Sequence, residues 1–200
     1  MSNAESFFKE FVERVTWEEY HQSYLSDAEF TPVITNVIKK NIGKMGWTAT
    51  TEYFRIDVIG YESKWKDVEK NAHDVGLGAY LWNMKVAVEH ENSKSAWTDE
   101  LIKLMQIRCP LKVIITYNYY DERPVGDQRK LDVAADLMQK VDSFENIKRD
   151  GEEILIIIGN GCSKKTKKSD YKSFDYRGYL FNYNSNKYVE LGHQTNEKPF

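Results

Sequence analysis

Residues 111–119 have the sequence LKVIITYNY, a continuous apolar run without the alternation of a half-exposed strand. Such a run is typical of a strand that is covered on both faces of its sheet. A predicted helix over about 127–144 follows, and then a second buried run, EILIIIG at 153–159. Two buried strands joined by a helix form a β-α-β unit. The segment therefore predicts an α/β fold with a central mixed sheet flanked by helices.

Further strands are predicted upstream of this unit. The segments TEYFRIDVIGY (51–61) and LWNMKVAVEHE (81–91) are rich in β-branched and aromatic residues. They can pair antiparallel, and residues 47–51 can supply another strand. SAWTDELIKLMQIR (95–108) predicts a helix capped by Thr98, and the tail predicts a hairpin around residues 184–186.

The N-terminal part is expected to be helical. Apolar residues recur at three- and four-residue spacing within residues 5–24, which predicts one amphipathic helix. A second helix is expected from about Thr31, with Pro32 in its first turn, to the glycines at 43 and 46. Residues 1–4 are given no structural weight.

Length and composition narrow the class of protein. The 200 residues, with 41% hydrophobic content, predict a single domain over 1–200. A formal charge of −3 argues against binding nucleic acid through bulk positive charge, so any such affinity must be regional. Cys109 and Cys162 lack the spacing of a disulfide framework or zinc site. With neither a signal peptide nor an 18-residue apolar run, the cytoplasm is the default expectation, with no membrane partner.

Three carboxylates interrupt the apolar runs of the two upstream strands. Glu89 and Glu91 are two residues apart and therefore share one face of a strand, and Asp57 lies in RIDVIG of the preceding strand. Antiparallel pairing can bring Asp57 beside Glu89. Acids held this close repel each other unless a cation compensates them. An all-oxygen set favours Mg²⁺ or Mn²⁺, and the chemistry that it implies is phosphodiester hydrolysis.

The order of these elements resembles the PD-(D/E)xK nuclease superfamily, the restriction-endonuclease-like fold with its αβββαβ core. The resemblance covers about residues 30–120, with the β-α-β unit and hairpin as a C-terminal extension. It implies a Mg²⁺-dependent endonuclease that cleaves DNA, with Asp57, Glu89 and Glu91 as catalytic residues and metal ligands. Ile56 stands where the family often has Pro. Glu91 stands where the family has lysine, as in some type II restriction enzymes, and is expected to act as a further ligand or to activate water.

The resemblance suggests additional residues and partners. The family sometimes takes another acid from the first helix, with Glu18 and Glu19 as candidates, and Lys94 is a candidate for the missing lysine. A homodimer is expected from the resemblance alone. A lysine-rich loop in GNGCSKKTKKSDYK (159–172) can meet nucleic-acid phosphates; its residues are Lys164, Lys165, Lys167 and Lys168.

Simpler interpretations stand beside each of these. The three acids can lie on a solvated sheet face paired with a basic residue such as Arg55, and the lysines can serve solubility. His90 faces away from the acids and is expected to be packed. The loss of the motif lysine also favours a non-catalytic nuclease-fold module that binds nucleic acid or a protein partner, for instance in a defence system.

Overall fold

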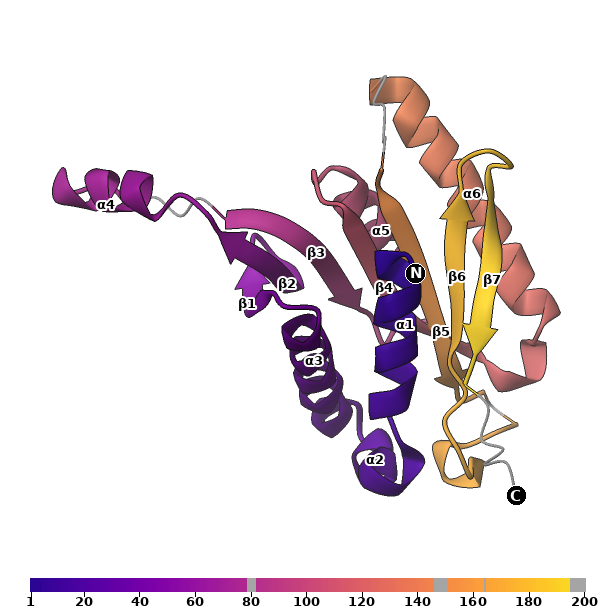
Figure 1. Cartoon of the computed structure of the whole chain (residues 1–200). Coiled ribbons are helices and arrows are strands. Elements are labelled where there is room, and N and C mark those ends of the chain that lie inside the picture. The colour runs from indigo at the N-terminus through magenta and orange to yellow at the C-terminus, as the bar shows by residue number, and fades with distance from the viewer. Residues whose placement is uncertain (79–81, 146–150, 164, 195–200) are drawn as a thin grey trace.

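A seven-stranded mixed sheet forms the centre of the protein (Figure 1). The computed structural model describes residues 1–78, 82–145, 151–163 and 165–194. Within these ranges the strands lie in chain order: β1 (Thr48–Tyr53), β2 (Ile56–Ser63), β3 (Trp82–His90), β4 (Leu111–Tyr119), β5 (Glu153–Gly161), β6 (Arg177–Asn182) and β7 (Lys187–His193). Strands β3, β4 and β5 run parallel, and the other neighbours run antiparallel. The predicted α/β class with a mixed sheet is confirmed.

The two apolar runs lie in the middle of the sheet as predicted. In β4 every residue except the last is buried, and in β5 every residue except the first. Helix α6 (Val125–Glu145) connects these parallel strands. The predicted C-terminal hairpin is also present, because β6 and β7 pair antiparallel around a turn in which Asn186 has a φ of 51°.

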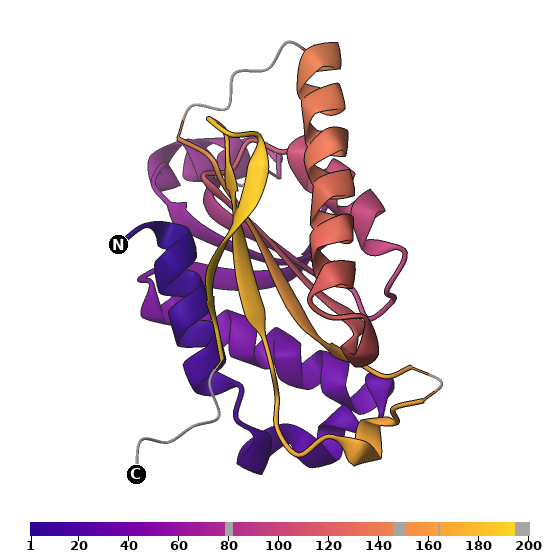
Figure 2. The same cartoon turned by 90° about the vertical axis from the view of Figure 1, so that its right-hand side faces the viewer.

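Helices cover both faces of the sheet (Figure 2). Helices α1 (Asn3–Arg14), α2 (Trp17–Tyr24) and α3 (Asp27–Lys44) pack on one face, and α5 (Trp97–Met105) and α6 pack on the other. Helix α4 (Lys66–Asp74) has no buried residue and extends away from the sheet (Figure 1). Two short 3₁₀ helices, Tyr120–Glu122 and Lys168–Asp170, follow β4 and β5. No helix among the described residues combines the length and the apolar character needed to cross a bilayer.

Several helix boundaries differ from those expected. The helix expected over residues 5–24 is two helices. They are separated by the β-branched residues Val15 and Thr16, and the backbone of Thr16 is extended. The break lets Trp17 pack edge-on against Phe174, with ring centroids 4.9 Å apart. Residues 1–4 do have a structural role, since Ser2 caps α1 and Ala4 is buried.

The other differences from the predictions concern the first residues of two helices and the connections on either side of β2. Helix α3 begins at Asp27, ahead of the expected Thr31, and α5 begins at Trp97, so that Thr98 is not its cap. The segment expected to be one strand over 51–61 contains the tight turn between β1 and β2, and helix α4, which was not predicted, lies between β2 and β3. The turn was missed because its residues, Phe54 and Arg55, are not usual turn formers.

Candidate active site

The antiparallel register of β2 and β3 brings two of the three predicted acids together. Val58 pairs with Val88, so Asp57 and Glu89 occupy directly opposite positions at the end of β3. Side chains at opposite positions of an antiparallel pair lie about 5 Å apart at their Cβ atoms. The Asp57 carboxylate also accepts a hydrogen bond from the His90 N–H at 2.8 Å, which fixes its orientation. The expectation that strand pairing brings Asp57 beside Glu89 is confirmed.

Burial makes this acid pair electrostatically unusual. The Glu89 side chain is 2% exposed. Burial raises its pKa from the ordinary 4.5 to about 8, an effect that Lys103 opposes and the charge of Asp57 reinforces. Burial also raises the pKa of Asp57, although the hydrogen bond from His90 works against the change. Two carboxylates with raised pKa values side by side are characteristic of functional sites.

A lysine that the sequence analysis did not single out completes the cluster. Lys103, on α5, places its Nζ 2.6 Å from Glu89 Oε1 and forms a second ion pair with Glu100. It also donates a hydrogen bond to the Arg55 carbonyl at 2.8 Å. Partial burial lowers the pKa of Lys103, but its acidic partners outweigh this effect and the net pKa is raised. The cluster therefore holds a fixed positive charge beside its most buried carboxylate.

The spacing along α5 offered a signal for this lysine. Leu101, Leu104 and Met105 form the buried face, so Lys103 lies on the flank of the helix next to β3. Its partner Glu100 is three residues earlier, the spacing of an intrahelical ion pair. A search for cations on the helix after the acidic strand would have found it.

The structure does not bring Glu91 or Lys94 to the acid pair. The Glu91 Oε1 accepts a hydrogen bond from the Ser93 N–H at 2.6 Å, so its carboxylate closes the loop after β3. The Lys94 Nζ donates to the Cys162 carbonyl at 2.5 Å and lies 4.0 Å from the ring centroid of Tyr119. Both side chains therefore have local structural partners in place of Asp57 and Glu89.

The candidates on α2 are also distant from the acid pair. Glu18 and Glu19 are exposed on α2, which packs on the sheet face opposite α5. His90 is buried away from the acids as expected, with its Nε2 3.0 Å from the Tyr117 hydroxyl. Burial lowers the pKa of His90 to about 4, so the imidazole is neutral near pH 7.

The lysine-rich loop follows β5. Lys165 and Lys167 are exposed, whereas Lys168 forms an ion pair with Asp27 and lies 5.1 Å from the ring centroid of Tyr24. Lys164 lies outside the described residues. Two of the four predicted phosphate contacts thus have accessible ammonium groups, and one is already paired.

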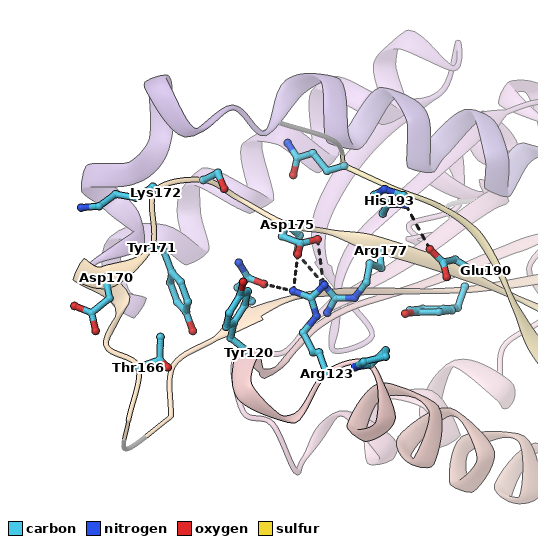
Figure 3. Close-up of a pocket in the computed structure, with 15 residues that line it drawn as sticks. Tyr120, Arg123, Thr166, Asp170, Tyr171, Lys172, Asp175, Arg177, Glu190 and His193 are labelled. Atoms are coloured by element: carbon cyan, nitrogen blue, oxygen red, sulfur yellow. Dashed lines mark hydrogen bonds and ion pairs between the residues drawn. The ribbon is translucent and has the colours of Figure 1, made fainter. Parts of the chain in front are cut away.

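A pocket of about 620 Å³ lies away from the acid pair, around the start of β6 (Figure 3). Its centre is a network in which Arg123 Nη1 donates to Asp175 at 2.5 Å and Arg177 Nε donates to the buried Asp127 at 2.8 Å. Its lining contains three basic residues, Arg123, Lys172 and Arg177, and three acidic ones, Asp170, Asp175 and Glu190. The ion pair of Arg177 with Asp127 therefore cross-links β6 to α6.

Asp57 and Glu89 are the side chains that could hold a Mg²⁺ ion at this site. Among the described residues, no group of three or more His, Cys, Asp or Glu side chains is arranged to hold a metal ion. However, Mg²⁺ in phosphoryl-transfer sites commonly uses one or two protein carboxylates and completes its shell with water and substrate phosphate. Glu89 Oε1 also lacks a hydrogen bond of good geometry within the described residues, despite its ion pair. The pair thus fits a hard divalent cation with two protein ligands.

Comparisons of the chain with protein-family models, with curated proteins and with solved structures find no match.

Proposed function

We propose that the protein is a Mg²⁺-dependent nuclease that hydrolyses DNA at the cluster of Asp57, Glu89 and Lys103. The observation that carries the proposal is the pairing of Asp57 with the buried Glu89 across two antiparallel strands, next to a lysine ammonium. The order α3, β1–β3, α5, β4 supports a restriction-endonuclease-like core, with α4 inserted between β2 and β3. DNA as the substrate, rather than RNA, is the expectation from the family resemblance.

Each residue has a defined task in this proposal. Asp57 and Glu89 would hold the cation, and the hydrogen bond from His90 to Asp57 keeps one carboxylate aimed at the site. A bound Mg²⁺ would supply polarisation of the phosphate and a lowered pKa for the attacking water. Lys103 remains 32% exposed, so its ammonium can reach a phosphate oxygen while Glu100 keeps it in place. Lys103 thus replaces Glu91 as the third catalytic residue of the site predicted from the sequence.

The function is tested by cleavage of supercoiled plasmid and of a labelled oligonucleotide in Mg²⁺, with matched substitutions. Asp57→Asn, Glu89→Gln and Lys103→Met should each reduce the rate at least about 100-fold, because each removes a ligand or the charge at the reacting phosphate. Glu91→Gln is the control and should keep most of the activity, since its carboxylate contacts the Ser93 N–H. Cleavage by the Glu89→Gln protein at the wild-type rate refutes the assignment.

A second candidate, a nuclease-fold module that binds without cutting, is favoured by one observation. The ammonium of Lys103 already neutralises Glu89 at 2.6 Å, which makes a metal unnecessary for charge balance. The two functions differ in their response to Mn²⁺. A nuclease should gain melting temperature in Mn²⁺ and a Glu89→Ala variant should not, whereas a binding module should show the same small response in both proteins.

A further inference from the structure

The turn between β1 and β2 has a strained backbone beside the acid cluster. Four non-glycine residues among those described have positive φ, and three of them lie in or next to this turn: Glu52 of β1 at 56°, and the turn residues Phe54 at 50° and Arg55 at 62°. Two-residue hairpin turns with positive φ at both central positions favour Asn-Gly, because other side chains are strained there. Backbone conformations of this kind cluster at active sites and ligand-binding sites, where the strain is part of the mechanism.

The turn displays side chains that contribute little to the fold. Phe54 is 80% exposed, and Arg55 is exposed as well. Phe54 contacts Tyr53 edge-on, with ring centroids 4.6 Å apart. Tyr53 also contacts Trp82, with ring centroids 4.8 Å apart. Trp82 in turn stacks on Tyr61 at 4.1 Å. A row of aromatic rings therefore runs from the turn along β1–β3, and its terminal member, Phe54, is open to solvent.

The turn is physically joined to the candidate active site. The Arg55 carbonyl accepts the hydrogen bond from Lys103 Nζ, the same atom that pairs with Glu89. The register that places Thr51 opposite Val58 and Tyr53 opposite Ile56 also places Glu52 opposite Asp57. Phe54 is therefore three residues from Asp57 along the hairpin, in the turn that Lys103 links to Glu89.

From these contacts we propose that Phe54 stacks on an unpaired base of the substrate strand, while Arg55 contacts a neighbouring phosphate. The inference rests on the proposed function and assigns its substrate class: nucleic acid with a single-stranded segment at the site. Aromatic side chains bind bases of single strands by stacking, without the energy needed to unstack a duplex. The ring of Phe54 is already 80% exposed in the free protein.

The test measures binding of a 20-nucleotide single-stranded DNA containing 2-aminopurine, with Ca²⁺ in place of Mg²⁺. Wild-type protein should quench the fluorescence and bind the single strand more tightly than the duplex of the same sequence. Phe54→Leu keeps an apolar side chain without a ring and should lower affinity about tenfold and remove the quenching. Phe54→Trp should restore both. Unchanged affinity and quenching in the leucine variant overturn the proposal.

A double variant separates the strain from the recognition. Phe54→Asn with Arg55→Gly supplies the preferred turn residues, so Tm should rise by about 4–8 °C while DNA affinity falls. The Arg55 carbonyl that orients Lys103 belongs to the backbone and is kept. An unchanged or lower Tm contradicts the role of strain.

The outcome is distinguishable from failure of the nuclease proposal. Binding that depends on Phe54 in a protein that never cleaves DNA supports this inference and removes the nuclease. Cleavage that depends on Glu89, together with binding that does not depend on Phe54, supports the nuclease proposal and removes the stacking role of Phe54.

Discussion

Replacing Glu89 by Gln should remove a large pH dependence of stability. The pKa of Glu89 is higher in the folded protein, about 8, than its ordinary 4.5, so folding favours the protonated form. Below about pH 4.5 Glu89 is protonated in both the folded and the unfolded state, and the stabilisation that it contributes is fully present. As pH rises towards 8 the unfolded state ionises more easily than the folded state, and stability is lost.

The size of the effect follows from the two pKa values. Each tenfold difference in acidity is worth about 1.4 kcal/mol, so the gap between 4.5 and about 8 sets an upper limit on the order of 5 kcal/mol. Between pH 5 and pH 8 we expect the free energy of unfolding of the wild type to fall by about 2–4 kcal/mol relative to that of Glu89→Gln. The charges of Asp57 and Glu89 act on each other, so the comparison reports the loss of the Glu89 carboxyl together with its coupling to Asp57.

The assay is urea denaturation in metal-free buffer at pH 5, 6, 7 and 8. Glu100→Gln is the matched control, because Glu100 pairs with the same lysine but retains 27% exposure. Its stability difference from the wild type should change with pH much less than that of Glu89→Gln, because the charge of Glu100 raises the pKa of Glu89 less than burial or the charge of Asp57 does. A Glu89→Gln difference that stays constant, within about 0.5 kcal/mol, would refute the electrostatic reasoning on which the site is built.

Three further predictions concern the fold and the nucleic-acid contact. Asp127→Ala removes the acceptor of the buried Arg177 Nε and of Asn118 Nδ2. It leaves Arg177 with Asp175 as its only ion-pair partner among the described residues, and should lower the free energy of unfolding by about 3–5 kcal/mol in urea titrations. A Cβ at Gly60 would lie 2.6 Å from a β3 side chain, so Gly60→Ala should cost about 1–3 kcal/mol by the same measurement, and an unaltered midpoint would contradict the packing. Lys165→Gln with Lys167→Gln should reduce the slope of log affinity against log salt for DNA by about 1–2, and an unchanged slope removes the loop from the interface.

Much of the architecture could be predicted from the sequence because its signals are strong and local. The apolar runs of β4 and β5 are continuous, and the hairpin of β6 and β7 surrounds an asparagine-rich turn. The alternation that places Glu89 and Glu91 on one face of a strand follows from backbone geometry alone, and the antiparallel pairing predicted for the two strands brings Asp57 beside Glu89. The meeting of these acids also depends on the register of β2 against β3, which shifts between Gly60 and Tyr61 and which the sequence does not specify.

The rest depends on contacts that sequence spacing does not encode. Phe54 and Arg55 form a tight turn although neither favours positive φ, so a turn search cannot find them. Lys103 joins the acids through the packing of α5 on the sheet, which the linear order does not specify. Conversely, Glu91 shared the strand parity of Glu89 but β3 ends at His90, which frees its carboxylate to contact Ser93.

The most direct test of the central claim is an anomalous difference map from crystals soaked in Mn²⁺. We expect a peak between the carboxylates of Asp57 and Glu89, with Lys103 displaced from Glu89 towards Glu100, and no peak in crystals of Glu89→Gln. Wild-type crystals that show no Mn²⁺ signal at the pair, with Lys103 still in contact with Glu89, would contradict the claim.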